Sequence, residues 1–215
     1  MSLPNFNEEK KLWKKGFKRV VGLDEAGRGP LAGPVVAGAV MVGSRFKIPE
    51  NLKDIKDSKL LSEERREELY EILTNHPQID WGVGIVSEKI IDRINILEAT
   101  KLAMKKSFFQ NQSGLDLKPS FLLLDGNFAL NFGRKEKNIP QKSIIKGDQK
   151  VFSISAASII AKVTRDRLMK KYHRKYPRYG FLQHKGYPTQ AHFATLKKFG
   201  PCPIHRKTFY PVSAT

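Results

Sequence analysis

Two adjacent acidic residues, Asp24 and Glu25, follow a short apolar run and are the first candidates for chemistry. Residues 19–23 are rich in β-forming types, so we expect a strand whose carboxyl end carries both acids. Side chains alternate along a strand, which should point one carboxylate into the sheet face. A hard divalent cation with oxygen ligands would compensate such carboxylates most simply. The alternative is a strand that ends with two acids facing water.

Two further acids stand at the expected end of a strand and the expected start of a helix. Residues 121–124 form an apolar strand candidate that ends on Asp125. Ligands commonly gather at the carboxyl ends of strands in α/β sheets, although a polar residue that opens a turn is the alternative. Asp148 lies just before a long helix candidate, where an acid is also an ordinary capping residue. Asp166 lies inside that helix between two arginines, so we assign it to an ion pair.

Gly27, Gly29 and Gly33 make the segment after the first acids rich in glycine. A dinucleotide-binding loop is rejected, because the spacing is GxGxxxG, Pro30 interrupts it and an apolar β-like run follows where a helix should open. The bare backbone of such a loop can approach a ligand closely, and Arg28 stands between its glycines. A plain glycine turn is the alternative.

The chain is strongly basic, with 39 Lys and Arg against 21 Asp and Glu and a net charge of +18. Such an excess attracts polyanions, and nucleic acid is the usual partner, although a protein that is merely basic is the alternative. Residues 172–187 mix cations with aromatic rings, which bind phosphates and stack on sugars or bases. A solvated helix face followed by core aromatics would have a similar composition.

Strands and helices that could position these residues alternate along the chain. Further strands are predicted over residues 35–42, 81–86 and 143–145. Helices are predicted over residues 62–73 with Ser62 as N-cap, from Asn95 with a capping-box spacing to Glu98, and over 153–176. The pattern predicts an α/β core over residues 1–165 and a small helical C-terminal lobe over 166–215, with a soft boundary inside one folding unit.

Cysteine content and hydropathy exclude several other classes. One cysteine, Cys202, excludes an internal disulfide and a cysteine-rich zinc site, and we interpret it as a small side chain in a turn. Residues 1–20 are polar and Lys-rich and do not resemble a signal peptide. The longest uncharged stretch, residues 29–44, is interrupted by proline and glycine, whereas a membrane helix needs roughly 20 apolar residues. We expect a cytoplasmic monomer with no membrane partner.

Taken in order, these motifs closely resemble prokaryotic ribonuclease HII, the type 2 ribonucleases H. The opening motif covers residues 24–35, and six later blocks cover residues 57–59, 95–100, 124–126, 146–148, 155–166 and 184–189. The resemblance implies a ribonuclease H-like fold, with a mixed five-stranded sheet flanked by helices and a helical C-terminal extension. Only 23 residues precede Asp24, and Arg28 is present, which favours this family over ribonuclease HIII, with its extra N-terminal domain and no such arginine.

The resemblance also implies an activity and a set of site residues. The protein would hydrolyse the RNA strand of RNA–DNA hybrids and incise 5′ of ribonucleotides embedded in duplex DNA, leaving 5′-phosphate and 3′-hydroxyl ends. Such an activity would remove ribonucleotides from DNA. Two Mg²⁺ or Mn²⁺ ions would be held by four carboxylates, those of Asp24, Glu25, Asp125 and Asp148. The substrate would be bound by Gly27, Arg28 and Gly29 at the 2′-hydroxyl, by Tyr187 stacked on the neighbouring deoxyribose, and by Lys59, Lys146, His184 and Lys185.

Two rival classes explain part of the pattern. A non-catalytic basic protein that binds RNA or DNA accounts for the charge and the aromatic residues, but not for acids at two strand ends. A different two-metal nuclease on the same core accounts for the acids, but not for the glycine loop around Arg28 or for Tyr187.

Overall fold

The computed structural model of the protein describes residues 3–53, 55, 58, 61–109, 118–132 and 139–214. Within these ranges, five strands form one sheet in the order β3-β2-β1-β4-β5. The strands are β1 (Val20–Ala26), β2 (Val35–Val42), β3 (Ile79–Val86), β4 (Phe121–Asp125) and β5 (Gln141–Ile144). β2 runs antiparallel to β1 and β3, whereas β4 runs parallel to β1 and β5. The predicted mixed five-stranded sheet is therefore confirmed.

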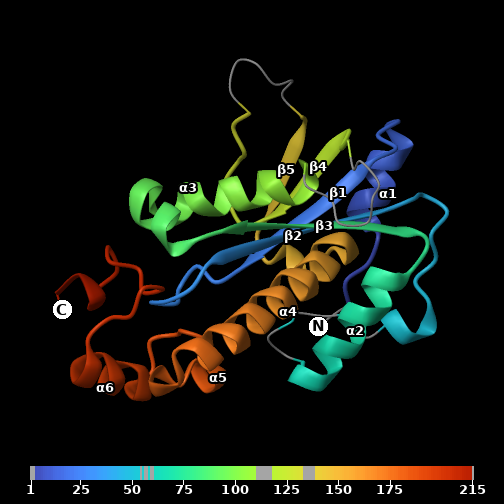
Figure 1. Cartoon of the computed structure of the whole chain (residues 1–215). Helices are drawn as coiled ribbons and strands as arrows, with labels where there is room; N and C mark the ends of the chain where they lie inside the picture. The colour runs from blue at the N-terminus through green and yellow to red at the C-terminus, as the bar shows by residue number, and fades with distance from the viewer. Residues whose placement is uncertain are drawn as a thin grey trace.

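Helices cover both faces of this sheet (Figure 1). α3 (Glu88–Phe109) lies on one face, and α4 (Phe152–Lys175) crosses the other with α2 (Glu63–Asn75) beside it. α1 (Asn7–Lys14) precedes the first strand, and α5 (Phe181–His184) and α6 (Gln190–Phe199) follow α4. Short 3-10 turns complete the described chain at η1 (Glu50–Leu52), η3 (Gly147–Gln149), η4 (Pro177–Tyr179) and η5 (Val212–Ala214). One apolar cluster fills the layer under α3, and another fills the layer between the sheet, α2 and α4.

Glycines in the central strands let the helices pack closely on the sheet. A Cβ on Gly22 in β1 would lie 2.5 Å from the backbone nitrogen of Ile154, and one on Gly38 in β2 would overlap the carbonyl oxygen of Ala157. Any side chain at these positions would push α4 away from the strands. The close approach brings the buried first half of α4 to the strand end that carries Asp24.

A residue distant in sequence caps the start of α4. Glu9, on α1, accepts hydrogen bonds from the backbone N–H of Ser153 at 3.1 Å and from its hydroxyl at 2.8 Å. The acid thus lies at the helix N-terminus, where unpaired N–H groups favour negative charge. Burial raises the pKa of Glu9. Our sequence analysis predicted no helix at α1 and therefore no such cap.

The two predicted N-caps are present. Ser62 accepts a hydrogen bond from the backbone N–H of Arg65 at 3.2 Å at the start of α2. Asn95 accepts from the N–H groups of Leu97 at 2.9 Å and Glu98 at 3.1 Å, and its φ of 66° breaks the helical path. Helical turns already precede Asn95 within α3, so the residue caps the second segment of a kinked helix and not an isolated one.

The predicted boundary at residue 165 falls inside α4, which is a single helix from Phe152 to Lys175. The core and the C-terminal lobe therefore share this helix, and their division stays a prediction. Among the described helices, none combines the length and apolar character that crossing a bilayer requires.

Candidate active site

Asp24 and Asp125 lie side by side on neighbouring parallel strands. Leu23 of β1 pairs in register with Leu124 of β4, so the next residue on each strand carries a carboxylate at the same edge of the sheet. Burial, and then the negative charges of Glu25 and Asp125, raise the pKa of Asp24 well above its usual value. Three of the predicted carboxylates therefore come close enough to repel one another.

Asp148 reaches the same corner through its neighbour Gly147. The backbone N–H of Gly147 donates to Oδ1 of Asp125 at 2.7 Å. Gly147 has no room for a side chain, because a Cβ there would lie 2.7 Å from Cδ1 of Ile154. Asp148, in η3, is buried. This contact places the backbone next to Asp148 beside Asp125, and the role of Asp148 as a metal ligand stays a prediction.

A cavity of about 180 Å³ opens beside the end of β1. Its wall contains six of the predicted site residues, namely Asp24, Glu25, Gly27, Arg28, Gly29 and Tyr187. Nη1 of Arg28 lies 3.5 Å from Oε1 of Glu25, so the arginine of the loop faces one of the acids. The remaining wall residues are Ala26, Ser58, Ser158 and Lys162. Two of the four predicted acids, the glycine loop and the tyrosine thus line one opening, whereas Asp125 and Asp148 are not among the described residues of its wall.

Ser158 and Lys162 lie one turn apart on α4 and were missed by the sequence analysis. The Ser158 hydroxyl donates a hydrogen bond to Asp24, and its oxygen lies 2.9 Å from that of Ser58. Nζ of Lys162 pairs with Oδ1 of Asp166 at 2.8 Å, which confirms the ion pair predicted for that acid. Burial lowers the pKa of Lys162. The one signal available was spacing, since positions 158, 162 and 166 share a helix face.

Arg165, fully buried in α4, supports the glycine loop from behind. Its Nε donates to the carbonyl oxygen of Pro34 at 3.0 Å, and its Nη2 to that of Ala32 at 3.2 Å. Its Nη1 donates to the carbonyl oxygen of Lys185 at 3.0 Å, and its guanidinium lies 5.7 Å from the ring centre of Tyr187. One buried cation therefore contacts both the loop and the segment that carries the tyrosine.

Arg206 supports the other end of the loop and is also fully buried. It donates to the carbonyl oxygens of Gly27 at 2.6 Å, Arg28 at 2.9 Å and Gly33 at 2.9 Å. Burial lowers the pKa of Arg206 to about 9. Sequence reasoning did not predict Arg165 or Arg206 as site residues, because bonds from a side chain to distant carbonyls leave no local pattern.

The opposite edge of the loop backbone is open. In the described part of the chain, the backbone N–H groups of Gly27, Arg28 and Gly29 donate no hydrogen bond. A Cβ on Gly29 would lie 3.9 Å from Cε1 of Tyr187, so the tyrosine ring stands across from the loop. These three donors are available to a ligand in the cavity that their residues line.

Three other predicted substrate residues, Lys146, His184 and Lys185, lie outside this wall. Nε2 of His184 contacts the carbonyl oxygen of Tyr179 at 2.6 Å. Nζ of Lys185 donates to the carbonyl oxygen of Leu182 at 2.6 Å, and Lys146 is exposed next to Asp148. Lys59 lies outside the described residues.

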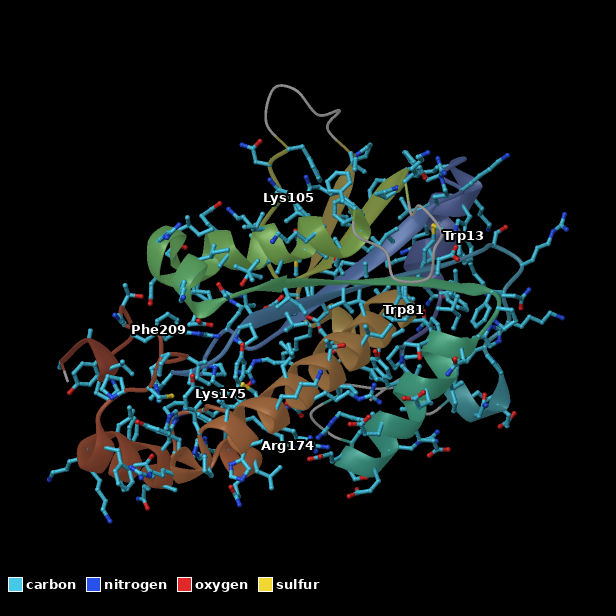
Figure 2. The ribbon with its side chains drawn as sticks, viewed as in Figure 1. Trp13, Trp81, Lys105, Arg174, Lys175 and Phe209 are labelled. Atoms are coloured by element: carbon cyan, nitrogen blue, oxygen red, sulfur yellow. The ribbon has the colours of Figure 1, made fainter. Side chains whose placement is uncertain are left out.

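The basic second half of α4 divides into two parts. Arg167 pairs with Glu67 at 2.6 Å, and Lys170 pairs with Glu63 at 2.8 Å, so acids of α2 neutralise the first part. Figure 2 shows the Arg174 side chain at the far end of α4, where it is exposed. Phosphate binding by residues at this end of α4 stays a prediction, for which Arg174 offers an exposed cation.

Cys202 is half-buried in the loop after α6. Burial raises the pKa of its thiol to about 11, so the neutral thiol predominates near pH 7. This protonation state agrees with the expectation that Cys202 is not a nucleophile.

The chemistry of the acids fits divalent cations. Asp24, Glu25 and Asp125 offer hard oxygen donors, and their mutual repulsion is the effect that a bound cation would relieve. Across the described residues, no three His, Cys, Asp or Glu side chains are already gathered as a metal site. Mg²⁺ usually keeps several waters and binds through one or two carboxylates and substrate phosphates, so it does not require a complete cage of protein ligands.

Known proteins are similar to this chain in both sequence and fold. The family model described as Ribonuclease HII matches residues 21–212. Ribonuclease HII of Chlamydia trachomatis serovar A is 51% identical over 210 residues, which cover 95% of this chain and 90% of the relative. Ribonuclease HII of Caldanaerobacter subterraneus subsp. tengcongensis is 49% identical over 201 residues, covering 94% and 78%. The crystal structure of the ribonuclease H2 from Pyrococcus horikoshii OT3 superposes with a TM-score of 0.71 at 32% identity, covering 91% of this chain and 95% of that one.

Proposed function

The chain belongs to the ribonuclease HII family, whose members are endoribonucleases acting on RNA–DNA hybrids, and from this premise we propose its detailed activity. The protein cleaves the RNA strand of hybrids and incises duplex DNA on the 5′ side of an embedded ribonucleotide. The products carry 5′-phosphate and 3′-hydroxyl ends. In the cell this reaction removes ribonucleotides from DNA.

The observation that carries this proposal is the grouping of strand-end acids and a glycine loop around one cavity. Asp24, Glu25, Asp125 and Asp148 would hold Mg²⁺ or Mn²⁺ at the scissile phosphate. Two bound ions would supply the activation of water and the stabilisation of charge on the leaving 3′-oxygen. Ser158 orients Asp24 by donating a hydrogen bond to it. No histidine base is required for this chemistry.

Recognition of RNA depends on the 2′-hydroxyl, which DNA lacks. The open backbone N–H groups of Gly27, Arg28 and Gly29 are the donors that contact it. Tyr187, 38% exposed at the facing wall, offers its ring to the neighbouring deoxyribose. The fixed separation between loop and ring supports recognition of a ribonucleotide followed by a deoxyribonucleotide.

Phosphate contacts on either side supply the remaining affinity. We assign them to Lys59, to Lys146 beside the acids, and to the exposed basic end of α4. His184 and Lys185 lie in the loop that carries Tyr187, and their hydrogen bonds to backbone carbonyls support a role in shaping it. Because phosphate contacts release counterions, binding should weaken steeply as salt increases.

A cleavage assay with three duplexes tests the activity: all-DNA, DNA with one ribonucleotide, and an RNA–DNA hybrid, each with Mg²⁺, Mn²⁺ or EDTA. We expect metal-dependent incision 5′ of the ribonucleotide and none of the all-DNA duplex. Asp125→Asn should bind the hybrid but cleave at least about 100-fold more slowly, since it loses an acid at the reacting phosphate. Asp80→Asn, at the opposite edge of the sheet, is the matched control and should cleave normally.

Three results would contradict the proposal or part of it. Absence of incision under every metal condition would favour a non-catalytic binding protein. Cutting of the all-DNA duplex would favour a different two-metal nuclease. Full activity of Asp125→Asn would remove the assigned role of that carboxylate.

A further inference from the structure

His205 and Arg206 are consecutive residues that contact both halves of the proposed recognition site. The side chain of Arg206 reaches the glycine loop, and the side chain of His205 reaches the Tyr187 segment through His192. Their backbone also joins the loop, because the N–H of Arg206 donates to the carbonyl oxygen of Leu31 at 2.8 Å. One short segment of the C-terminal extension therefore ties together two elements that are about 160 residues apart in sequence.

Arg206 is matched to the loop by the shape of its guanidinium. Its Nε and Nη2 both donate to the carbonyl oxygen of Gly33, while Nη2 and Nη1 also reach those of Gly27 and Arg28. Backbone carbonyls are its direct hydrogen-bond partners, and the negative charges of Asp92 and Glu88 also favour its buried cation. A lysine ammonium, which is a compact point charge, could not span three carbonyls in this way.

His205 and His192 form a directional relay to the backbone of Tyr187. Nδ1 of His205 lies 2.9 Å from the backbone nitrogen of Cys202 and 3.2 Å from its carbonyl oxygen, which already accepts from the backbone N–H of His205, so we assign the proton of this ring to Nε2. That Nε2 lies 3.0 Å from Nε2 of His192, which must therefore accept. The proton of His192 is left on Nδ1, which donates to the carbonyl oxygen of Tyr187 at 2.9 Å.

The relay is buried and neutral. His192 and His205 are 0% and 2% exposed, and the ring of His184 stacks on that of His192 with centres 4.3 Å apart. Nδ1 of His184 accepts from the backbone N–H of Gly186 at 3.1 Å, so this third ring also fixes the segment just before Tyr187. No proton has to move in this relay, and its role is to hold a carbonyl in place.

We propose that His205 and Arg206 are positioning residues that set the distance and angle between the Gly27–Gly29 loop and the Tyr187 ring. This inference rests on the proposed recognition of a ribonucleotide between those two elements. Arg206 acts directly on the loop, and His205 acts on Tyr187 through His192. Neither side chain lines the cavity, so neither contacts the substrate.

Double-mutant kinetics separate this role from general stabilisation. Arg206→Lys and His205→Phe should each lower kcat/KM on a duplex with one ribonucleotide by about 10- to 100-fold, since small misplacements of recognition groups are costly. Met104→Ala, a buried change under α3, is the stability control and should stay within about twofold once folded, because it touches no recognition group. With Tyr187→Ala already present, His205→Phe should add no further loss, whereas Arg206→Lys still should.

If the losses in kcat/KM from His205→Phe and Tyr187→Ala multiplied in the double variant, the two residues would act independently. That result would overturn the assigned route through His192. If Met104→Ala lost as much kcat/KM as Arg206→Lys, general destabilisation would explain the effect of Arg206→Lys. Unchanged kinetics in folded Arg206→Lys would overturn the role of that residue.

NMR and hydrogen exchange test the positioning role without measuring catalysis. They therefore decide it even if the wild-type protein fails to incise the duplex. Long-range ¹H–¹⁵N NMR of the wild-type imidazoles should show His192 protonated on Nδ1 and His205 protonated on Nε2. The reverse assignment would overturn the relay. Hydrogen exchange in Arg206→Lys should accelerate in the peptide covering residues 27–34 and stay unchanged in α2, and a uniform acceleration would contradict local positioning.

Discussion

Alanine at position 27 adds one methyl group, yet it should detach the glycine loop from its support. Gly27 has a φ of +99°, and a Cβ there would overlap Nε of Arg165 and lie 2.5 Å from its Cδ and 2.8 Å from the carbonyl oxygen of Pro34. Arg165 is 1% exposed and donates to three carbonyl oxygens. It cannot move aside without losing some of these bonds.

The expected loss of stability follows from two contributions. An unfavourable backbone conformation for a residue with a Cβ costs about 1–3 kcal/mol. Loss of one charge-assisted hydrogen bond from buried Arg165 costs about 1.5–3 kcal/mol more. Together they lower the free energy of unfolding by about 2.5–6 kcal/mol, and the melting temperature by about 5–24 °C for a chain of this length.

Gly29→Ala is the matched control, since it lies in the same loop. Its Cβ would meet only Cε1 of Tyr187, at 3.9 Å, and its φ is not positive in the strained range. Its free energy of unfolding should stay within about 0.5 kcal/mol of wild type. The added methyl still enters the cavity wall, so cleavage at a ribonucleotide should decrease in a folded protein.

Urea and thermal denaturation followed by circular dichroism compare the two variants, and the duplex assay measures cleavage. We expect Gly27→Ala to lose stability, and Gly29→Ala to lose cleavage activity while it keeps wild-type stability. Equal melting temperatures for Gly27→Ala and wild type would refute the account of Arg165 as a rigid support.

Three other predictions concern residues outside the reacting groups. Asp166→Asn removes the partner of Lys162 and should lower the free energy of unfolding by about 1–3 kcal/mol in urea titrations, with cleavage retained; a stable but inactive variant would contradict the ion-pair assignment. Glu9→Ala removes the cap of α4 and should cost about 1–2 kcal/mol in the same measurement, and an unchanged midpoint would show that the cap is not stabilising. Burial lowers the pKa of both His192 and His205 to about 4, against about 6.5 in an unfolded chain, so their neutral forms stabilise the fold above pH 6.5. This contribution, about 3 kcal/mol for each ring, should be lost as the pH falls from about 6.5 to about 4, and a flat profile of unfolding free energy over that range would contradict their burial as neutral rings.

The sequence alone determined the features that depend on local patterns. Apolar runs located the strands, although β1 continues past the predicted end through Asp24 and Glu25 to Ala26, and Asp24 and Asp125 become neighbours once β1 and β4 pair. Ser62 and Asn95 could be predicted as caps because an N-cap bonds to backbone N–H groups within three residues. The motif spanning residues 24–35, taken together with the six later blocks, also indicated the family, which the comparisons confirm.

Only the tertiary structure decided how the recognition elements are held. Arg165 and Arg206 appear in the sequence as ordinary basic residues, yet both are buried and bonded to backbone carbonyls of one loop. His192 and His205 acquire opposite tautomers through a contact between side chains 13 residues apart. Glu9 becomes the cap of a helix whose N-terminus lies 144 residues away.

The physical reason is the range of the interactions involved. Strand periodicity and capping are satisfied within a few residues, so residue types and spacing reveal them. A buried donor has to find an acceptor wherever the packed chain supplies one, and a backbone carbonyl has no residue type that could mark it in advance. The groups that hold the loop and the Tyr187 ring are therefore recognisable only after the strands, α4 and the C-terminal extension have packed together.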